Sequence, residues 1–193
     1  MKNIVYIGNN LSAETKYIPT LVTLSNLLVH EGHNIIIASS KKNKFLRILD
    51  MIWTVCKNFR KTDLVLIDTF GAFNFYYALV IAQVCRMLSI PYIPILHGGN
   101  LPERLKNNVL YSKLIFANSF KNIAPSNYLK TEFEKAGFKT ELIPNIVEIG
   151  DYNFKQRVSY KPRLLFVRAF HQIYNPTMAV KVLYEVIQQY PEA

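Results

Sequence analysis

The sequence predicts an α/β fold in which helices cover both faces of a parallel β-sheet, a doubly wound, Rossmann-like arrangement. Short apolar runs alternate along the chain with longer segments whose apolar residues recur at helical spacing. The apolar runs lack the in-and-out alternation of a half-exposed strand, which is typical of parallel strands buried on both faces. Half of the 193 residues are hydrophobic, enough for a full-sized core.

The predicted elements follow one another in strict alternation. The strands are expected at residues 2–8, 34–39, 63–68, 91–96, 122–124 and 139–143. The helices between them are expected at residues 17–30, 44–59, 72–88, 110–119 and from Ser126 to Ala136. The glycine-rich segment that starts at His97, together with Pro102, predicts a loop between the fourth strand and the following helix.

Capping residues fix the ends of two helices. Ser126 can accept a hydrogen bond from a free backbone amide at the start of its helix. Gly32 and Gly137 follow helices at the position where a left-handed glycine ends the helical turn.

The chain divides into one domain and the beginning of another. Residues 1–150 contain all six strands, and the polar residues 151–162 carry no periodicity and predict a linker. Residues 163–193 predict one further β-α unit, a strand at 163–167 and a helix at 176–190. One such unit cannot bury both faces of its strand, so it is not expected to be a domain by itself.

Ligands of a doubly wound sheet gather at the carboxyl ends of its strands. These ends are predicted at Gly8, Ser39, Asp68–Gly71 and His97–Asn100. Gly8 allows backbone to approach a ligand, and the amides that follow it suit a phosphate; an ordinary tight turn explains the glycine equally well. The GxGxxG pattern is absent from this loop, so a dinucleotide site is not expected.

His97 is the predicted catalytic residue. It is the first residue of the loop after the fourth strand and is followed by Gly98, Gly99 and Asn100. A histidine at this edge can hydrogen-bond a sugar hydroxyl or accept a proton, and the alternative is a structural histidine.

Other polar residues have structural interpretations. Asp68 could contact acceptor hydroxyls, but an aspartate that caps the next helix is the commoner explanation. His30 and His33 flank a turn with no third ligand, so no metal site is expected. Cys56 and Cys85 are predicted to be reduced, buried thiols.

The segment from Lys121 to Ile149, followed by residues 163–190, carries a family resemblance. It reads Ile-Ala-Pro-Ser, then the capped helix, Ala-Gly-Phe and Leu-Ile-Pro-Asn-Ile-Val, and the strand Pro-Arg-Leu-Leu-Phe-Val follows the linker. This order resembles the hinge region of glycosyltransferase family four, the retaining enzymes of GT-B fold. The resemblance covers essentially the whole chain, and its strongest part is residues 123–182.

The resemblance implies an enzyme that transfers a sugar from a nucleotide-diphosphate sugar to a glycan or lipid-linked acceptor, with retention and without a metal or cofactor. It implies that His97 lies near the transferred sugar and that Arg168 and His171 hold the donor phosphates. The expected substrate-binding residues are Gly8, Asn9, Asn10, Gly98, Gly99, Asn100 and Asn145. A chain with only the start of the donor domain is expected to be inactive alone. Two alternatives remain, a non-catalytic sugar- or ligand-binding module and a GT-B-fold sugar-nucleotide epimerase.

The net charge of +10 is concentrated in residues 41–61, where Asp50 is the only acid. The bases are Lys41, Lys42, Lys44, Arg47, Lys57, Arg60 and Lys61. No nucleic-acid-binding module accompanies them, so an anionic membrane surface is the expected partner. A core-facing apolar stripe beside solvated lysines is the alternative. Without a signal peptide or spanning segment, the expected location is cytoplasmic, with peripheral attachment to the inner face of the membrane.

Overall fold

The structure is a computed structural model that describes residues 1–10, 19–147, 149–151, 153–156 and 164–191 of the chain. Contacts within the chain divide it into two compact units, Met1–Val147 and Glu148–Ala193. Each unit is described by itself below.

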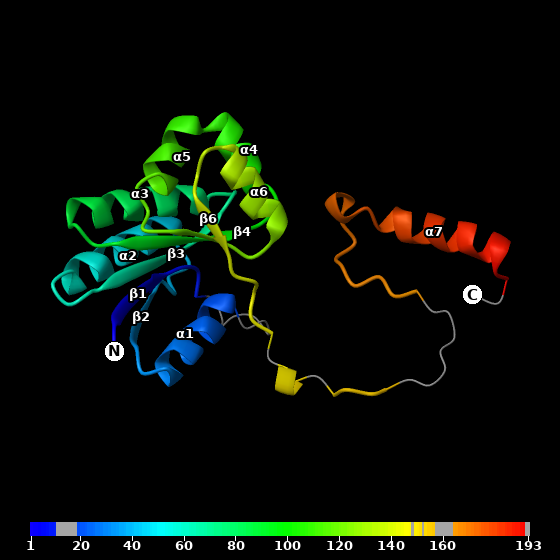
Figure 1. The fold of residues 1–193 in the computed structure, drawn as a ribbon, viewed down its shortest axis with the longest axis horizontal. Coiled ribbons are helices and arrows are strands. Elements are labelled where there is room, and N and C mark those ends of the chain that lie inside the picture. Colours follow the sequence, from blue (N-terminus) through cyan, green and yellow to red (C-terminus); the bar gives the residue numbers. More distant parts are fainter. Residues whose placement is uncertain (11–18, 148, 152, 157–163, 192–193) are drawn as a thin grey trace. The chain divides into compact units, whose positions relative to one another are not determined.

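The first unit contains a six-stranded, all-parallel sheet, which confirms the predicted α/β class (Figure 1). The strand order is β2-β1-β3-β4-β5-β6. The chain adds β2 on one side of β1 and all later strands on the other, so the order of the strands reverses between β1 and β3. The strands are β1 (Asn3–Ile7), β2 (Asn34–Ala38), β3 (Leu64–Phe70), β4 (Tyr92–His97), β5 (Asn122–Ala124) and β6 (Thr140–Leu142).

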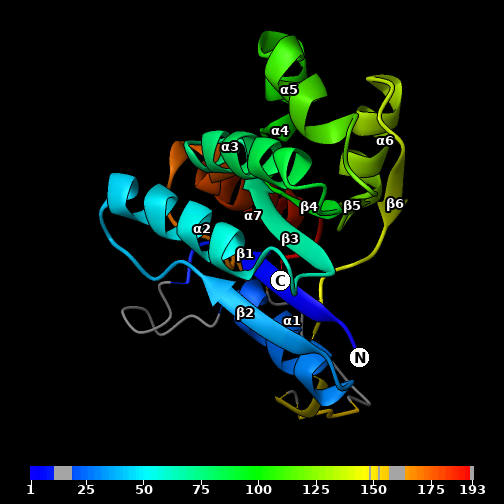
Figure 2. The ribbon, with the colours of Figure 1, turned by 90° about the vertical axis from the view of Figure 1, so that its left-hand side faces the viewer.

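Helices lie on both faces of this sheet. Figures 1 and 2 show α1 on one face and the helices α2 to α6 on the other. The helices are α1 (Thr20–His30), α2 (Lys44–Asn58), α3 (Asn74–Met87), α4 (Leu101–Asn107), α5 (Val109–Phe116) and α6 (Asn127–Lys135).

Each face of the sheet has its own core. The larger core packs β1, β3 and β4 against α2, α3 and the later helices, around fully buried side chains such as Phe75, Ile81 and Phe133. The smaller core lies under α1 and contains Ile4, Tyr6, Leu21 and Leu66. The face beneath α1 carries the site described below.

The predicted serine cap and the predicted left-handed glycine of α6 are both confirmed. Ser126 Oγ accepts a hydrogen bond from the Leu129 amide over 3.4 Å, and Gly137 has φ of +85°. The predicted loop after His97 is only partly correct, because Leu101–Asn107 form α4 with Pro102 in its first turn. Proline is tolerated there because the amide it lacks has no partner inside the helix.

The strand β3 is longer than predicted, and this changes the interpretation of Asp68. The strand continues to Phe70, so Asp68 lies inside it and does not cap α3. Phe73 occupies the capping position of α3 and makes no side-chain cap bond.

The second unit has a helix but not the expected strand. Its helix α7 spans Pro176–Gln189, and Gln172–Tyr174 form a short 3-10 turn. The described residues of the predicted strand, Leu164–Val167, are not in a strand. A β-strand is completed by hydrogen bonds to a neighbouring strand, and no other strand is present in the described residues of this unit.

The two cysteines lie in different environments. Cys85 is buried in the larger core, and burial, with a smaller contribution from Cys56, raises the pKa of its thiol to about 12. Cys56 is exposed, so the prediction that both thiols are buried was wrong for this residue. Within the described residues, no helix combines the length and the apolar character needed to cross a bilayer.

Candidate functional site

Side chains from three adjacent strands meet under the carboxyl edge of the sheet. The Tyr6 hydroxyl of β1 donates a hydrogen bond to Asp68 Oδ1 of β3 over 3.0 Å. His97 Nε2 of β4 lies 2.9 Å from the same oxygen. The carboxylate of Asp68 therefore joins a tyrosine and a histidine that are far apart in the sequence.

The strand register explains why these three side chains meet. Tyr6 lies opposite Leu66, two residues before Asp68, and Ile95 lies opposite Asp68, two residues before His97. Because side chains of a strand alternate between faces, positions two residues apart share a face. The three side chains thus form a diagonal line on the α1 face, across the β1–β3 reversal where ligands of such sheets bind.

The site is sheltered from water. Tyr6 is fully buried, and the side chains of His97 and Asp68 are only 11% and 8% exposed. Burial, and then the charge of Asp68 and its hydrogen bond, raise the pKa of Tyr6 far above the usual range for a phenol. Tyr6 is therefore a permanent hydrogen-bond donor to Asp68. The His97 ring is stacked on Phe70, with ring centroids 4.7 Å apart.

Gly8 makes room for this group. A Cβ atom at this position would meet Leu21 Cδ1 of α1 and would lie 2.6 Å from Asp68 Oδ2. The glycine therefore lets α1 and the Asp68 carboxylate approach the end of β1 closely. In this structure the space beside Gly8 is filled by protein atoms.

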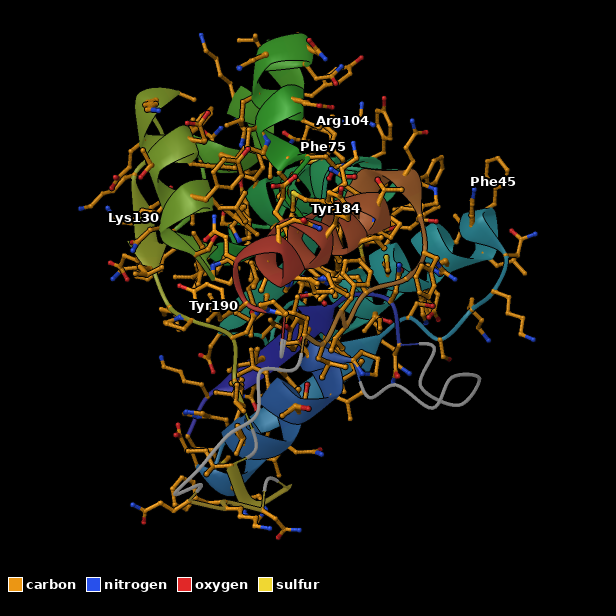
Figure 3. The ribbon with its side chains drawn as sticks, turned by 90° about the vertical axis from the view of Figure 1, so that its right-hand side faces the viewer. Phe45, Phe75, Arg104, Lys130, Tyr184 and Tyr190 are labelled. Carbon is orange, nitrogen blue, oxygen red and sulfur yellow. The ribbon has the colours of Figure 1, made fainter. Side chains whose placement is uncertain are left out.

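A second glycine contact connects the loops after β3 and β4. A Cβ at Gly71 would overlap Asn100 Oδ1, and Gly98 adopts φ of +85° in the turn that leads to α4. Arg104 Nε donates to the Gly71 carbonyl over 2.6 Å, and Figure 3 labels Arg104 beside Phe75, over whose ring it lies. Among the other residues of this loop, Gly99 accepts a long hydrogen bond of 3.5 Å from Tyr128.

The loop after β1 is held by Arg47. This buried arginine donates to Asn9 Oδ1 over 3.2 Å and to the carbonyls of Lys41 and Lys42. The amide of Asn10 donates to the Ser39 carbonyl over 3.1 Å. Arg47, which lies on α2, thus stabilises the strand-end loops and is not part of the surface charge. Residues 11–18 lie outside the described residues.

Three further predicted site residues are Asn145, Arg168 and His171. Asn145 lines an apolar cavity of about 330 Å³ on the α1 face, together with Tyr6, Ile95 and Ile123. Arg168 and His171 belong to the second unit, where both lie beside Tyr174: the guanidinium carbon of Arg168 is 5.5 Å from the ring centroid and the His171 ring is 6.5 Å from it.

The outer face of α2 is apolar and exposed. Phe45, Leu46, Leu49 and Trp53 are between 57% and 79% exposed, and Figure 3 shows Phe45 at the start of α2 with its ring directed outward. The opposite face of the helix packs into the core through Met51 and Val55. Exposed bases surround the apolar face: Lys41, Lys42, Lys44, Lys57, Arg60 and Lys61. We call these four apolar and six basic residues the α2 surface. The alternative of a core-facing stripe is wrong for its four apolar members.

Sequence reasoning missed Tyr6 and assigned Asp68 to a helix cap. The available signal was a polar residue inside an otherwise apolar strand, which has to find a partner when it is buried. His33, interpreted as structural, has a visible contact: its Nδ1 accepts a hydrogen bond from the Lys2 amide over 3.2 Å. Within the described ranges, no three His, Cys, Asp or Glu side chains are grouped to hold a metal ion. A reaction without metal stays a prediction.

Comparisons with known proteins gave a distant structural likeness. No protein-family model matches the chain, and no curated protein matches it in sequence. Among solved structures, HepE from Anabaena, determined in complex with UDP, is similar over 78% of this chain with 18% sequence identity and a TM-score of 0.47. The matched region spans 45% of the HepE chain, less than half of its length.

Proposed function

We propose that this chain is the acceptor-side domain of a retaining glycosyltransferase of family four, followed by the start of its donor domain. The observation that carries the proposal is the buried Tyr6–Asp68–His97 group at the carboxyl edge of β1, β3 and β4. Its position at the chain reversal of a doubly wound sheet is the usual place for a ligand. The motif from Ile123 to Asn145 and the glycines after His97 support the same assignment.

In this proposal His97 contacts the sugar that is transferred. A histidine can hydrogen-bond a hydroxyl of the sugar or move a proton, and water exclusion around it strengthens both interactions. Gly98, Gly99 and Asn100 shape the loop beside it, and Gly8, Asn9 and Asn10 border the acceptor.

The donor half of the proposal concerns Arg168 and His171. Cationic side chains can stabilise a leaving diphosphate, a task that other enzymes give to Mg²⁺. We propose that the donor is a nucleotide-diphosphate sugar, that the acceptor is a glycan or a lipid-linked sugar, and that no metal takes part. The chain of 193 residues is then inactive without the rest of the donor domain.

The test is a transfer assay with the natural protein that contains this chain. We expect release of a nucleoside diphosphate from at least one nucleotide sugar in the presence of EDTA, with an α-linked donor giving an α-linked product by NMR. His97→Ala is expected to lower kcat by about 10²- to 10⁴-fold, the usual range for loss of a general acid or base, and to affect turnover far more than stability. The matched control is His33→Ala, whose ring binds only the Lys2 amide among the described residues. Unchanged turnover with a large fall in melting temperature would return His97 to a structural role.

We further propose that the α2 surface binds the anionic face of a membrane, which would suit a lipid-linked acceptor. Exposed aromatic and aliphatic residues among bases combine anchorage with attraction, and each base near an anionic surface contributes about 1 kcal/mol. The charge of these bases favours anionic lipid over a protein partner of mixed charge.

Vesicle sedimentation tests the membrane proposal. Binding is expected with vesicles that contain phosphatidylserine and is expected to weaken as salt rises, because exposed charges are screened over about 8–10 Å. Changing Lys41, Lys42 and Lys44 to Glu should weaken it strongly, and Trp53→Ala should weaken it at every salt concentration. The matched control changes Lys130, Lys135 and Lys139, outside the α2 surface, to Glu. Equal binding to neutral and anionic vesicles, or to neither, would contradict the proposal.

A non-catalytic ligand-binding module is the second candidate, because the order β2-β1-β3-β4-β5 is also that of flavodoxin-like sheets. Saturable binding of a flavin or a free sugar by the natural protein, without any transfer or epimerisation of nucleotide sugars, would favour it.

A further inference from the structure

We propose that Asp68, held in place by Tyr6, is a positioning residue that fixes the tautomer of His97, with the ring proton on Nε2 and the lone pair on Nδ1. The inference deepens the proposed transfer reaction, and its kinetic consequence rests on that function. It also names the chemistry that His97 can recognise, which is a hydroxyl donor and not an anionic oxygen.

The first step of the argument is the direction of the hydrogen bond between Asp68 and His97. Asp68 Oδ1 lies 2.9 Å from His97 Nε2, and a carboxylate oxygen only accepts hydrogen bonds. Nε2 therefore carries a proton. In this proposal the ring is neutral, with a single N–H, so that Nδ1 keeps its lone pair.

The second step is the rigidity of this arrangement. His97 is stacked on Phe70 with an angle of 19° between the rings, which opposes a flip that would exchange the two nitrogens. The low exposure of His97 and Asp68 means that water competes weakly for their hydrogen bond. A buried carboxylate such as that of Asp68 therefore has a stronger influence than an exposed carboxylate on which ring nitrogen carries the proton.

The third step is the role of Tyr6. Its hydroxyl donates to the same oxygen, Oδ1, from a fully buried position. Gly8 allows the other oxygen, Oδ2, to lie against the end of β1, where a side chain would collide with it. Tyr6 in β1 and Gly8 directly after it thus determine the orientation of the Asp68 carboxylate before any ligand binds.

The consequence concerns the ligand. A lone pair on Nδ1 accepts a hydrogen bond from a hydroxyl group, or takes its proton, but it repels the oxygen of a phosphate. We therefore assign His97 to a hydroxyl of the sugar or of the acceptor, and we leave the donor phosphates to other residues. Among the described residues, Asp68 is the only hydrogen-bond partner found for the ring of His97.

The test begins with the unmodified 193-residue chain, labelled with ¹⁵N-histidine. The chain has four histidines, and the spectrum of His97→Gln identifies the signals of His97. Long-range ¹H–¹⁵N correlations at neutral pH are expected to show Nε2 in the protonated range and Nδ1 in the unprotonated range. A proton on Nδ1, or rapid averaging of both tautomers, would overturn the inference without the need for any variant.

Two variants and one control then assign the cause. Asp68→Asn replaces an acceptor by a group that also donates, so the preference for the Nε2 proton is expected to be lost. Tyr6→Phe removes only the hydroxyl and is expected to reduce the preference. The control is Tyr92→Phe, which removes another buried hydroxyl, bonded to the Ile115 carbonyl over 2.7 Å and without contact to a histidine. An equal change of tautomer in Tyr92→Phe, or none in Asp68→Asn, would contradict the assignment to Asp68.

The proposed function and this inference fail in different ways. The tautomer is measured without donor or acceptor, so an Nε2 proton in a protein that transfers no sugar refutes only the transferase. In a protein that does transfer sugar, Tyr6→Phe should lower kcat more than it changes KM, whereas Tyr92→Phe should leave kcat unchanged. Active transfer with an Nδ1 proton on His97 refutes only the inference.

Discussion

The two units of this chain have similar sequence patterns and different structural outcomes. In the first unit, apolar runs of a few residues become strands because each finds a neighbour, and even the nine-residue helix α6 buries Leu129 and Phe133. In the second unit, the apolar residues Leu164–Val167 do not form a strand, and no residue of α7 is buried. The difference teaches that an apolar pattern specifies which segments could be buried, whereas burial itself depends on the neighbours that the rest of the fold supplies.

The sharpest way to break this comparison is hydrogen exchange, where the expected difference is largest. Amides of β4 are expected to exchange only through global unfolding, which costs about 5–15 kcal/mol in typical domains. The amides of Leu164–Val167 are expected to exchange close to the rate of an open chain, because the structure gives them no strand partner. The measurement is mass spectrometry of peptic peptides, with the β4 peptide as internal control. Slow exchange at Leu164–Val167 would show that the second unit is stabilised as the first is.

Replacing one aromatic residue in each unit by alanine compares how much the packing of each unit contributes to the free energy of unfolding. Phe133 is fully buried and makes an edge contact with Phe116 at 4.8 Å. Phe133→Ala should lower the free energy of unfolding by about 3–5 kcal/mol, because it removes apolar contacts and leaves a cavity. Tyr184, on α7, is 63% exposed, and Tyr184→Ala should change the stability by less than about 0.5 kcal/mol. Urea unfolding followed by fluorescence measures both, and equal losses would contradict the difference in packing.

Two glycines provide the smallest and most local comparison. Gly8→Ala places a methyl group against Leu21 and Asp68, and such overpacking should cost about 1–3 kcal/mol. Gly150→Ala, in the second unit, meets nothing within 4 Å and should be neutral or stabilising by up to about 1 kcal/mol. Thermal unfolding of both variants is the measurement. A neutral Gly8→Ala would mean that the approach of Asp68 to the end of β1 is looser than described.

The sequence was sufficient for the elements of the first unit but not for their exact ends. Parallel strands buried on both faces leave a clear apolar signal, and the signals of Ser126 and Gly137 are local, so both could be read directly. The extension of β3 beyond Asp68 and the helix α4 after the glycine-rich loop were missed. Both depend on neighbours: the last residues of β3 pair with β4, and Leu101 and Leu105 of α4 are buried in the core.

In the candidate site, too, some features are local in the sequence and others depend on contacts between distant residues. The sequence alone placed His97 beside two glycines at the carboxyl edge of the sheet, where such sheets bind ligands, because the glycines and the apolar run before them are local features. Only the tertiary structure decided that Asp68 meets His97 and Tyr6, since residues 62 positions apart become neighbours through the register of three strands. It also decided that the apolar face of α2 at Phe45 and Trp53 is exposed. A helix with apolar residues on more than one side has no local signal for the side that the sheet will cover, because that choice is made by long-range packing.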